Sequence, residues 1–241
     1  MNRCELSHLE RTPIDVDLAR RQHEHYEQTL ASCGYRIARL PPADDQPDAV
    51  FVEDILVVVD GLAIVTRPGA ESRRGEIAGL NAALPATLHQ AAVTAPGTLD
   101  GGDVLRVGTR LFVGRSARTN EEGIRQLTAL VGPLGISVTP IPVTACLHLK
   151  SAVTAVGDDL LLLNPAWIDQ GHFAGYRTVF TDPAESAAAN ALRVHERVIY
   201  SDRHVRTADR LRAAGVPLLT LDVSEIEKAE GAVTCCSVLV G

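Results

Sequence analysis

Residues 99–114 read Leu99-Asp-Gly-Gly-Asp-Val-Leu-Arg-Val-Gly-Thr-Arg-Leu-Phe-Val-Gly114. This stretch places an acid before an apolar strand, which is followed by a turn and a second apolar strand. Three further segments follow a similar plan: 48–69, 147–164 and 189–201. A supersecondary unit repeated in this way predicts an α/β fold assembled from similar pieces.

Five residues stand at the start of successive repeats: Asp54, Asp100, His148, Asn190 and Cys235. Their spacing is roughly 45 residues, within the range of repeated supersecondary units. Units that close in a ring place their equivalent strand ends around one central axis. Two acids, a histidine and a cysteine would then converge at that axis.

An open, doubly wound sheet is the rival architecture, because it also alternates strands and helices. It is less favoured, since no strand is followed by a glycine-rich phosphate loop. Helices are predicted between the repeats by apolar spacing and capping residues. They are expected at 15–33, 76–84, after the cap-like residues 116–120, at 205–214 and at 224–229, and further strands at 35–40, 216–221 and around Cys235.

Length and charge restrict the class of protein. The chain has 241 residues and a formal net charge of −7. We expect a single domain over residues 1–241, with a core that needs no disulfide or metal. The acidic balance, without a basic patch interleaved with aromatics, argues against nucleic-acid binding. No signal peptide or membrane span is recognisable, so we expect no membrane association and a cytoplasmic location.

The five cysteines, at positions 4, 33, 146, 235 and 236, form no Cys-x-x-Cys pair. Their number and spacing predict neither a disulfide framework nor a tetrahedral zinc site. Reduced thiols are the simplest interpretation. We interpret Cys235 as a nucleophile. The alternative is that both Cys235 and Cys236 are small buried apolar side chains.

A cysteine attacks as its thiolate, which at neutral pH needs a cation, a histidine or a helix N-terminus nearby. His148 stands at the repeat position that matches Cys235, and it can hold the thiolate and later activate water. Asp100 can orient the imidazole. A single histidine is more often a buried structural residue. The joint occurrence of the three at matched positions favours Cys235, His148 and Asp100 as catalytic residues.

Three carboxylates, Asp48, Glu53 and Asp54, stand at the start of one apolar strand. Buried acids destabilise a fold unless they meet a cation. They therefore lie either exposed at the strand end or facing a positively charged ligand. We favour the cationic ligand.

Six ordered segments carry a resemblance that runs from about Leu6 to the end of the chain: Asp48–Asp54, Thr66–Arg74, Leu99–Leu105, Arg118–Asn120, Leu147–Ser151 and Thr234–Ser237. Together they resemble the dimethylarginine dimethylaminohydrolase family of guanidino-group-modifying enzymes. The resemblance implies a pentein-type, five-bladed α/β propeller with pseudo-fivefold repeats and a central active site. It also implies a hydrolase that converts Nω,Nω-dimethyl-L-arginine, or the monomethyl form, to L-citrulline and dimethylamine or methylamine.

The resemblance implies catalytic roles at the matched positions. Cys235 attacks the guanidinium carbon and forms a covalent thiouronium intermediate. His148 acts first as general acid and then as general base, and Asp100 supports it. No redox or phosphate chemistry is involved, so we expect no cofactor. The expected partner is a small methylated arginine.

The resemblance also implies substrate-binding roles. Asp54, with Asp48 and Glu53 nearby, grips the substrate cation. Arg73 and Arg118 hold the substrate carboxylate, for which two planar guanidinium groups are well suited.

Less extensive matches add further expectations. Leu6 and the backbone of Ala229 correspond to the family's substrate-lid and binding-loop positions. Zinc is not required, but an inhibitory zinc ion at Cys235 and His148 is plausible, since thiolate and imidazole both bind zinc. A homodimer is a further expectation.

Three alternatives to this function stay open. The nearest is a deiminase of the same superfamily that acts on free arginine or another guanidine, although arginine deiminases carry an inserted helical region that is missing here. A non-catalytic propeller used for binding is the alternative from another class. A zinc hydrolase is disfavoured for want of suitably spaced ligands. One departure from the family is that this chain begins only a few residues before Leu6, so we expect an N-terminal strand to be missing.

Overall fold

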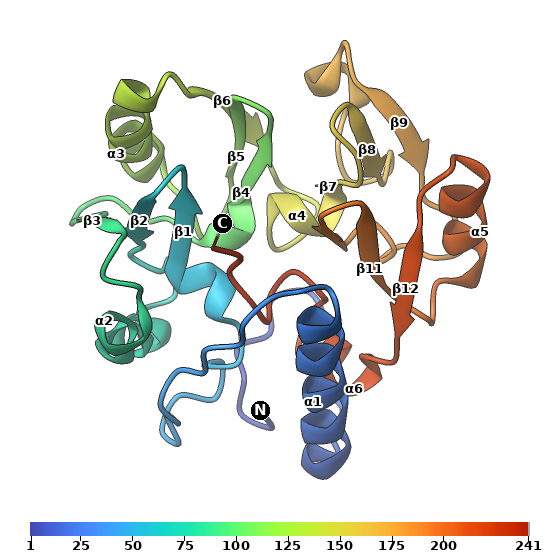
Figure 1. Cartoon of the computed structure of the whole chain (residues 1–241), viewed down its shortest axis with the longest axis horizontal. Helices are drawn as coiled ribbons and strands as arrows, with labels where there is room; N and C mark the ends of the chain where they lie inside the picture. The colour runs from blue at the N-terminus through green and yellow to red at the C-terminus, as the bar shows by residue number, and fades with distance from the viewer. Residues whose placement is uncertain (241) are drawn as a thin grey trace. The chain divides into compact units, whose positions relative to one another are not determined.

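Four three-stranded sheets are present in residues 1–240, the part of the chain that this computed structural model describes, apart from the side chains of residues 81 and 82. Each sheet consists of an antiparallel hairpin and a third strand that pairs in parallel with the second strand of the hairpin. Figure 1 labels the strands in chain order. The repeat predicted from the sequence corresponds to the four hairpins.

The chain divides into two compact units, which are described separately. The first unit comprises Met1–Ile37 and Lys150–Thr234, and the second comprises Ala38–Leu149 and the residues from Cys235 onward. The expectation of one domain over the whole chain stays a prediction.

The second unit contains two of the sheets. Their strands are β1 (Leu56–Val59), β2 (Leu62–Val65) and β3 (His89–Ala92), and β4 (Val104–Val107), β5 (Arg110–Arg115) and β6 (Ser137–Pro142). The β1–β2 hairpin turns at Asp60-Gly61, as predicted, with φ of 45° and 80°. Positive φ at both central residues is the turn geometry that matches the twist of paired strands.

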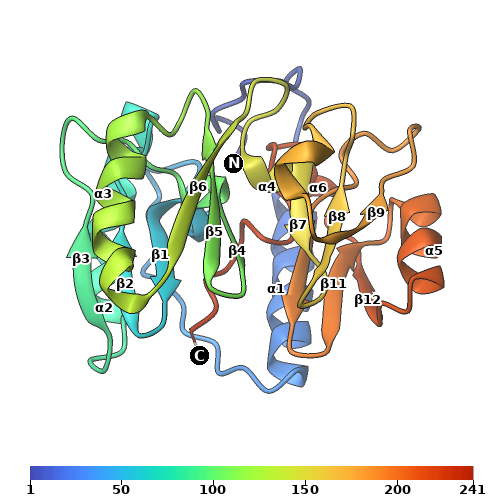
Figure 2. The same cartoon turned by 90° about the horizontal axis from the view of Figure 1, so that it is seen from above.

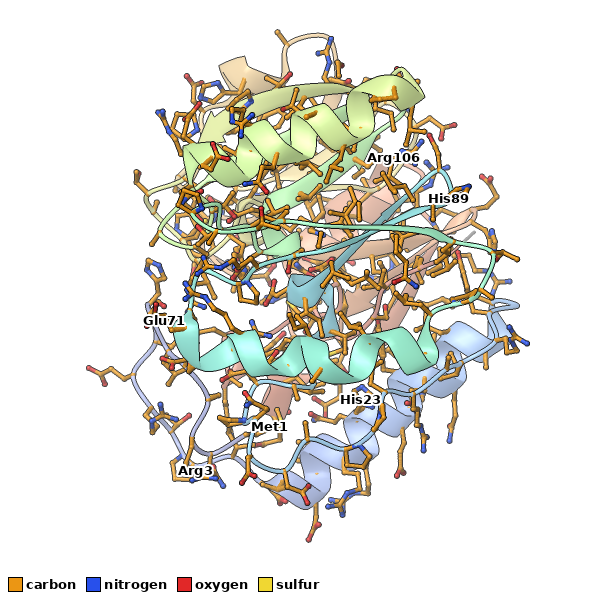
Figure 3. The ribbon with its side chains drawn as sticks, turned by 90° about the vertical axis from the view of Figure 1, so that its left-hand side faces the viewer. Met1, Arg3, His23, Glu71, His89 and Arg106 are labelled. Carbon is orange, nitrogen blue, oxygen red and sulfur yellow. The ribbon has the colours of Figure 1, made fainter. Side chains whose placement is uncertain are left out.

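Short helices lead into or follow the strands of the second unit. They are η1 (Val52–Ile55), η2 (Glu71–Gly79), α2 (Leu80–Ala83), η3 (Gly101–Asp103), α3 (Glu121–Val131) and η4 (Gly132–Leu134). Figure 3 shows η2 and α2 as one continuous helix that starts at Glu71, five residues before the predicted start at Glu76. The side chain of Asn120 accepts from the N–H of Gly123 and caps α3, which packs on β5 and β6 (Figure 2).

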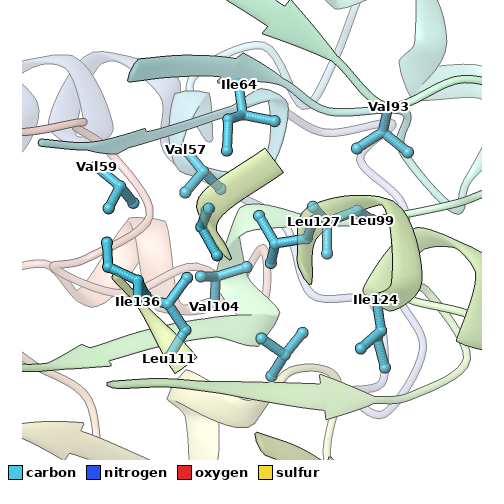
Figure 4. Close-up of a cluster of buried hydrophobic side chains, with 12 residues drawn as sticks. Val57, Val59, Ile64, Val93, Leu99, Val104, Leu111, Ile124, Leu127 and Ile136 are labelled. Carbon is cyan, nitrogen blue, oxygen red and sulfur yellow. The ribbon is translucent and has the colours of Figure 1, made fainter. Parts of the chain in front are cut away.

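A cluster of buried aliphatic side chains joins the two sheets of the second unit and α3 (Figure 4). Val57 and Ile64 come from the first sheet, Val104 and Leu111 from the second, and Leu127 from α3. Each fully buried side chain of this kind stabilises the fold by roughly 1.5–3 kcal/mol. This core holds the starts of β1 and β4 in place, where the polar residues of the site precede the strands.

The first unit holds the other two sheets and the longest helix. Its strands are β7 (Val153–Ala155), β8 (Leu160–Leu163), β9 (Arg177–Phe180), β10 (Ala191–Val194), β11 (Arg197–Ser201) and β12 (Leu218–Leu221), and its helices are α1 (Val16–Ser32), η5 (Gln170–Phe173), α5 (Val205–Ala213) and α6 (Ser224–Glu227). Helix α4 (Leu149–Ala152) begins at the last residue of the second unit before Cys235, and its other residues belong to the first unit. Asp15 caps α1 by accepting from two N–H groups of its first turn, as expected for an N-cap aspartate. Helix α1 packs beside α6 (Figures 1 and 2).

Two predicted strands are wrong. Residues 35–40 form no strand, because they join none of the sheets in residues 1–240, and most of their side chains are exposed. Cys235 and Cys236 lie in a turn rather than in a terminal strand, and the carbonyl of Cys235 accepts from the N–H of Glu53 at 3.1 Å. Apolar alternation alone does not make a strand without a partner.

In residues 1–240, no helix combines the length and the apolar character needed to cross a membrane.

Candidate active site

Four of the five repeat starts lie in the second unit, and the side chains of three of them, Asp54, Asp100 and His148, meet. Asp54 is in η1, Asp100 comes directly before η3, and His148 comes directly before α4. One ligand atom of each side chain lies within 4.8 Å of those of the other two, and all three residues are buried. The repeat thus brings the two acids and the histidine together.

Asp100 holds one nitrogen of the His148 imidazole. Nε2 of His148 lies 3.0 Å from Oδ2 of Asp100, which is fully buried. The other carboxylate oxygen accepts from the N–H of Gly69 at 2.8 Å. Because both oxygens have partners, the carboxylate is fixed, and it fixes the orientation of the imidazole.

The second imidazole nitrogen faces Asp54. Nδ1 of His148 lies 3.8 Å from Oδ1 of Asp54, which is longer than a hydrogen bond. Burial alone would lower the pKa of His148. The charge of Asp54, the hydrogen bond to Asp100 and the charge of Asp103 outweigh it and raise the pKa to about 9. His148 is therefore an imidazolium at neutral pH, and the Nδ1 that faces Asp54 carries a proton.

Asp54 stays a carboxylate although it is buried. Its Oδ1 accepts from the N–H of Gly102 at 3.1 Å, and its Oδ2 pairs with Nη1 of Arg73 at 2.5 Å. Burial alone would raise the pKa of Asp54. The charges of His148 and Arg73 and the Gly102 hydrogen bond offset that effect and lower the pKa to about 2. A fixed carboxylate of this kind can accept hydrogen bonds from a planar cation such as a guanidinium.

Arg73 is buried between two carboxylates, with a side chain that is 4% exposed. Its Nε and Nη2 donate to the two carboxylate oxygens of Glu76, at 2.9 and 2.8 Å, which fixes the plane of the guanidinium. Nη2 also donates to the backbone carbonyls of Asp48 and Phe51. The structure therefore places the charge of Arg73 beside Asp54 and Glu76. Its expected contact with a substrate carboxylate stays a prediction.

The remaining predicted binding residues of the second unit are also buried. Nη1 of Arg118 lies 3.8 Å from Oδ2 of Asp100, and the N–H of Arg118 donates to Oγ of Ser116. Asp48, four residues before η1, and Glu53, within η1, are buried, at 3% and 8% exposure. These residues therefore share one compact unit with the Asp54, Asp100 and His148 cluster.

Cys235 belongs to the same unit. Its carbonyl accepts from the N–H of Glu53, the residue directly before Asp54. The Cys235 residue is half-buried, whereas Cys236 is buried. Burial, with smaller contributions from Cys235 and Glu53, raises the pKa of Cys236 well above its usual range. Cys236 therefore remains a thiol at neutral pH, and the predicted role of Cys235 as the nucleophile stays a prediction.

Leu6 and Ala229 lie in the first unit. Glu230, which follows Ala229, has a positive φ of 57° and accepts from the backbone N–H groups of residues 7–9 at 2.5–3.0 Å. These bonds join the N-terminal segment after Leu6 to the loop that contains Ala229.

Asn190, the fourth repeat start, also lies in the first unit. Its Nδ2 donates to Oγ1 of Thr234 at 2.9 Å, and its Oδ1 accepts from the N–H of Thr234 at 3.1 Å. Nδ2 also lies 3.2 Å from the carbonyl oxygen of Lys150. Asn190 thus fixes the residue that directly precedes Cys235.

Among the described residues, Asp54, Asp100 and His148 are the three whose ligand atoms come close enough together to hold a metal ion. They do not fit a metal ion well at neutral pH. A metal would have to displace a proton from His148, whose pKa is about 9, and Asp54 is already paired with Arg73. The expected inhibitory zinc at Cys235 and His148 stays a prediction.

The structure explains why both central residues of the Asp-Gly-Gly-Asp motif are glycines, which the sequence analysis missed. A Cβ on Gly102 would lie 2.6 Å from Nδ1 of His148 and 2.8 Å from Oδ1 of Asp54, and one on Gly101 would overlap the carbonyl oxygen of Glu53. Only glycine lets η3 approach η1 and the imidazole this closely. The available signal was a doubled glycine directly after the predicted catalytic acid.

Three polar residues of the site were also missed: Glu76, Asp103 and Ser116. Burial raises the pKa of Glu76, although its pairing with Arg73 opposes the shift. Glu76 could have been found as an acid one helical turn after Arg73, and Asp103 as the second acid of its motif. No local pattern singled out Ser116.

Two curated proteins with the same enzyme name are similar to this chain over most of its length, although no protein-family model matches the sequence. The N(G),N(G)-dimethylarginine dimethylaminohydrolase of Streptomyces coelicolor is 43% identical over 236 residues, which are 97% of this chain and 90% of the relative. The enzyme of the same name from Pseudomonas aeruginosa is 36% identical over 227 residues, 92% of this chain and 89% of the relative.

Solved structures agree with these relatives. A variant of the Pseudomonas aeruginosa dimethylarginine dimethylaminohydrolase in complex with citrulline has a TM-score of 0.91 and 34% identity, over 96% of this chain and 91% of that one. An amidinotransferase of saxitoxin biosynthesis from Microseira wollei, at 17% identity over 92% of this chain and 83% of that one, has a TM-score of 0.84 and shows the fold alone. The fold class is the pentein-type α/β propeller predicted from the sequence.

Proposed function

The chain belongs to the dimethylarginine dimethylaminohydrolase family, and from this premise we propose that it hydrolyses Nω,Nω-dimethyl-L-arginine to L-citrulline and dimethylamine. Nω-Methyl-L-arginine is the second proposed substrate and gives citrulline and methylamine. The observation that supports this proposal best is the buried cluster in which Asp54 and Asp100 flank His148. It offers an anion for the guanidinium and a proton for the departing amine.

In the first proposed step, the Cys235 thiolate attacks the guanidinium carbon, and the bond from this carbon to the dimethylamino nitrogen breaks. The leaving nitrogen takes the proton from Nδ1 of His148, because Nε2 is held by Asp100. Dimethylamine departs, and the rest of the substrate stays on the sulfur as a thiouronium.

In the second proposed step, Nδ1 of the neutral His148 takes a proton from water, and the water oxygen bonds to the thiouronium carbon. The carbon–sulfur bond breaks as the ureido carbonyl of citrulline forms, which returns Cys235 to its thiolate. One further proton passes to solvent, where dimethylamine takes one up. His148 ends the cycle protonated, as it began.

Asp54 is the proposed ligand of the substrate guanidinium. Its pKa of about 2 keeps it charged at any physiological pH, and Arg73 and Gly102 fix its two oxygens. A guanidinium is a poor electrophile because of its resonance, so it must be held close to the nucleophile in a fixed orientation. Asp48 and Glu53 are proposed to add negative potential from the adjoining turn of η1.

Arg118 and Arg73 are the proposed ligands of the substrate carboxylate. The charge of Arg73 is already offset by Asp54 and Glu76, so Arg118 is expected to contribute more to the binding energy. Leu6 and the backbone of Ala229 are proposed to contact the amino-acid end of the substrate.

One assay tests the proposed reaction. The purified protein is incubated with dimethylarginine, methylarginine, arginine and agmatine, and both the ureido product and the released amine are identified. Equal amounts of citrulline and dimethylamine from dimethylarginine support the proposal. Release of ammonia from arginine in preference would make the protein a deiminase instead. Turnover of none of the four compounds would favour a binding module.

Two variants identify the nucleophile. Cys235→Ser should abolish turnover, whereas Cys236→Ser should change it little, because the Cys236 thiol is buried and protonated. The reverse pattern would assign the attack to Cys236. The expected homodimer is proposed on the resemblance alone, and the cytoplasmic location on the interpretation of the five cysteines as reduced thiols.

A further inference from the structure

Asp103, the second acid of the Asp-Gly-Gly-Asp motif, takes no direct part in the proposed chemistry, yet it is fully buried. Isolated buried carboxylates are costly, so a retained one needs strong hydrogen-bond donors around it. The donors around Asp103 come from two different parts of the site.

One carboxylate oxygen of Asp103 holds the backbone next to His148. Oδ1 accepts from the N–H of Leu149 at 2.9 Å. The fit is close, since a Cβ on Gly114 would overlap Oδ1 and would lie 3.1 Å from Cβ of Leu149. The carboxylate therefore fixes the first turn of α4, directly after the proposed general acid.

The other carboxylate oxygen reaches the loop that carries Arg118. Oδ2 accepts from the hydroxyl of Ser116 at 2.6 Å. The same hydroxyl oxygen accepts from the N–H groups of Arg118 and Thr119, at 3.0 and 3.2 Å. Because Ser116 accepts two N–H bonds, its own proton is directed to Asp103.

We propose that Asp103 is a positioning residue for the proposed reaction, whose carboxylate fixes the backbone at His148 and, through Ser116, the loop of Arg118. It thereby sets the distance between the proton donor and a proposed substrate-binding arginine. This inference rests on the proposed function, since it assigns Asp103 a part in the same reaction.

An ionised carboxylate suits this place better than an amide. Both of its oxygens accept, whereas an asparagine would present an N–H₂ group either to the N–H of Leu149 or to the hydroxyl of Ser116. Asp54 and Asp100 face the imidazole of His148, and the charge of Asp103 also supports its protonated form. Burial raises the pKa of Asp103 itself, whereas the charge of His148 and the hydrogen bonds from Ser116, Thr119 and Leu149 act to lower it. Asp103→Asn therefore removes an aligned acceptor and one of the three charges at the same time.

The test compares Asp103→Asn, Ser116→Ala and the control Asp169→Asn. Asp103→Asn should lower kcat by about 10- to 100-fold, the effect of a lost charge-assisted hydrogen bond. It should also move the titration of the His148 ring protons, followed by NMR, to lower pH. Ser116→Ala should raise KM by about 3- to 10-fold with kcat largely kept, because it loosens the Arg118 loop while Asp103 keeps its bond to the N–H of Leu149. Asp169, an exposed acid that accepts from the N–H of Gly171, should give wild-type values.

Several results would overturn the proposal. One is an unchanged kcat in a folded Asp103→Asn protein. Another is a loss of activity in which the His148 titration stays at its wild-type pH, since that indicates a purely structural acid. Should Asp103→Asn not fold, Ser116→Ala decides: a raised KM supports the proposal and an unchanged KM overturns it.

The NMR titration also distinguishes a failure of the Asp103 proposal from a failure of the proposed function. If the wild-type protein turned over no methylated arginine, the proposed function would fail. The His148 titration would still move in Asp103→Asn if the carboxylate positions the imidazole, and would not move if it does not.

Discussion

Removing the His148 imidazole should change how stability depends on pH. The surrounding acids raise the pKa of His148 from 6.5 to about 9. A group with a higher pKa in the folded state binds its proton more tightly there than in the unfolded chain. The resulting stabilisation is complete below about pH 6.5 and is lost as the pH rises through about 9.

The size of this effect follows from the shift. One pKa unit corresponds to about 1.4 kcal/mol, so the protonated imidazole stabilises the folded protein by about 3 kcal/mol at pH 6. About 2–3 kcal/mol remains at pH 7 and almost none at pH 10. In His148→Gln this pH-dependent part disappears, whereas the cost of the new side chain is the same at every pH.

Urea unfolding, followed by the fluorescence of the single tryptophan, Trp167, measures the difference. The comparison is made between Cys235→Ser and Cys235→Ser/His148→Gln, so that the thiol does not titrate. Their difference in unfolding free energy should shrink by about 3 kcal/mol from pH 6 to pH 10. His172→Gln, which changes an exposed histidine, is the control. A difference between the two proteins that stays constant over this range would refute the imidazolium assignment.

Three more predictions follow from the site. Arg73→Met leaves two buried carboxylates without their cation and should cost about 3–5 kcal/mol of unfolding free energy. Arg74→Met, which breaks an exposed pair, should cost less than about 1 kcal/mol, and equal costs in denaturant titrations would argue against the buried network. Gly102→Ala pushes a methyl group against His148 and should lower kcat about 100-fold with an unchanged circular dichroism spectrum; full activity would contradict the geometry. Finally, kcat/KM should fall as the pH rises above about 9, because His148 then lacks the proton for the leaving amine, and a profile that is flat to pH 10 would exclude it as the acid.

The hairpins could be predicted because their signals are local. Alternating apolar residues and a turn at Asp60-Gly61 determine β1 and β2 without help from the rest of the chain. The polar residue before each hairpin was visible for the same reason. The repeat then predicts that each of these polar residues stands at the same place relative to its own hairpin.

One third strand, β12, was expected at 216–221, but the other three could not be predicted, because their pairing is a long-range property. β3 reads His89-Gln-Ala-Ala92, which has little strand character, and β6 contains Pro140 and Pro142. Proline is tolerated in β6 because it is an edge strand that pairs only with β5. Residues 35–40 have the better local pattern but belong to none of the sheets in residues 1–240. Strand pairing therefore overrode local propensity: β3 and β6 became strands despite a poor local pattern, and residues 35–40 did not despite a better one.

The residue types of the site could be predicted, but not all of their pairings. The sequence indicated carboxylates, a histidine and arginines that meet. It did not indicate that Arg73 would lie between Asp54 and Glu76, because the pairing of buried charges depends on which side chains share one desolvated space. The motif glycines were missed for a similar reason, since their close contacts come from η1 and His148.

The central claim is that the Cys235 sulfur becomes covalently bound to the substrate carbon during turnover. Rapid acid quench of the protein with dimethylarginine, followed by peptide mass spectrometry, tests it directly. Both candidate thiols lie in the peptide after Lys228, so fragment ions must separate Cys235 from Cys236. We predict an adduct with the mass of dimethylarginine less dimethylamine on Cys235 alone. Turnover that leaves no adduct on Cys235 and that persists in Cys235→Ser would contradict the claim.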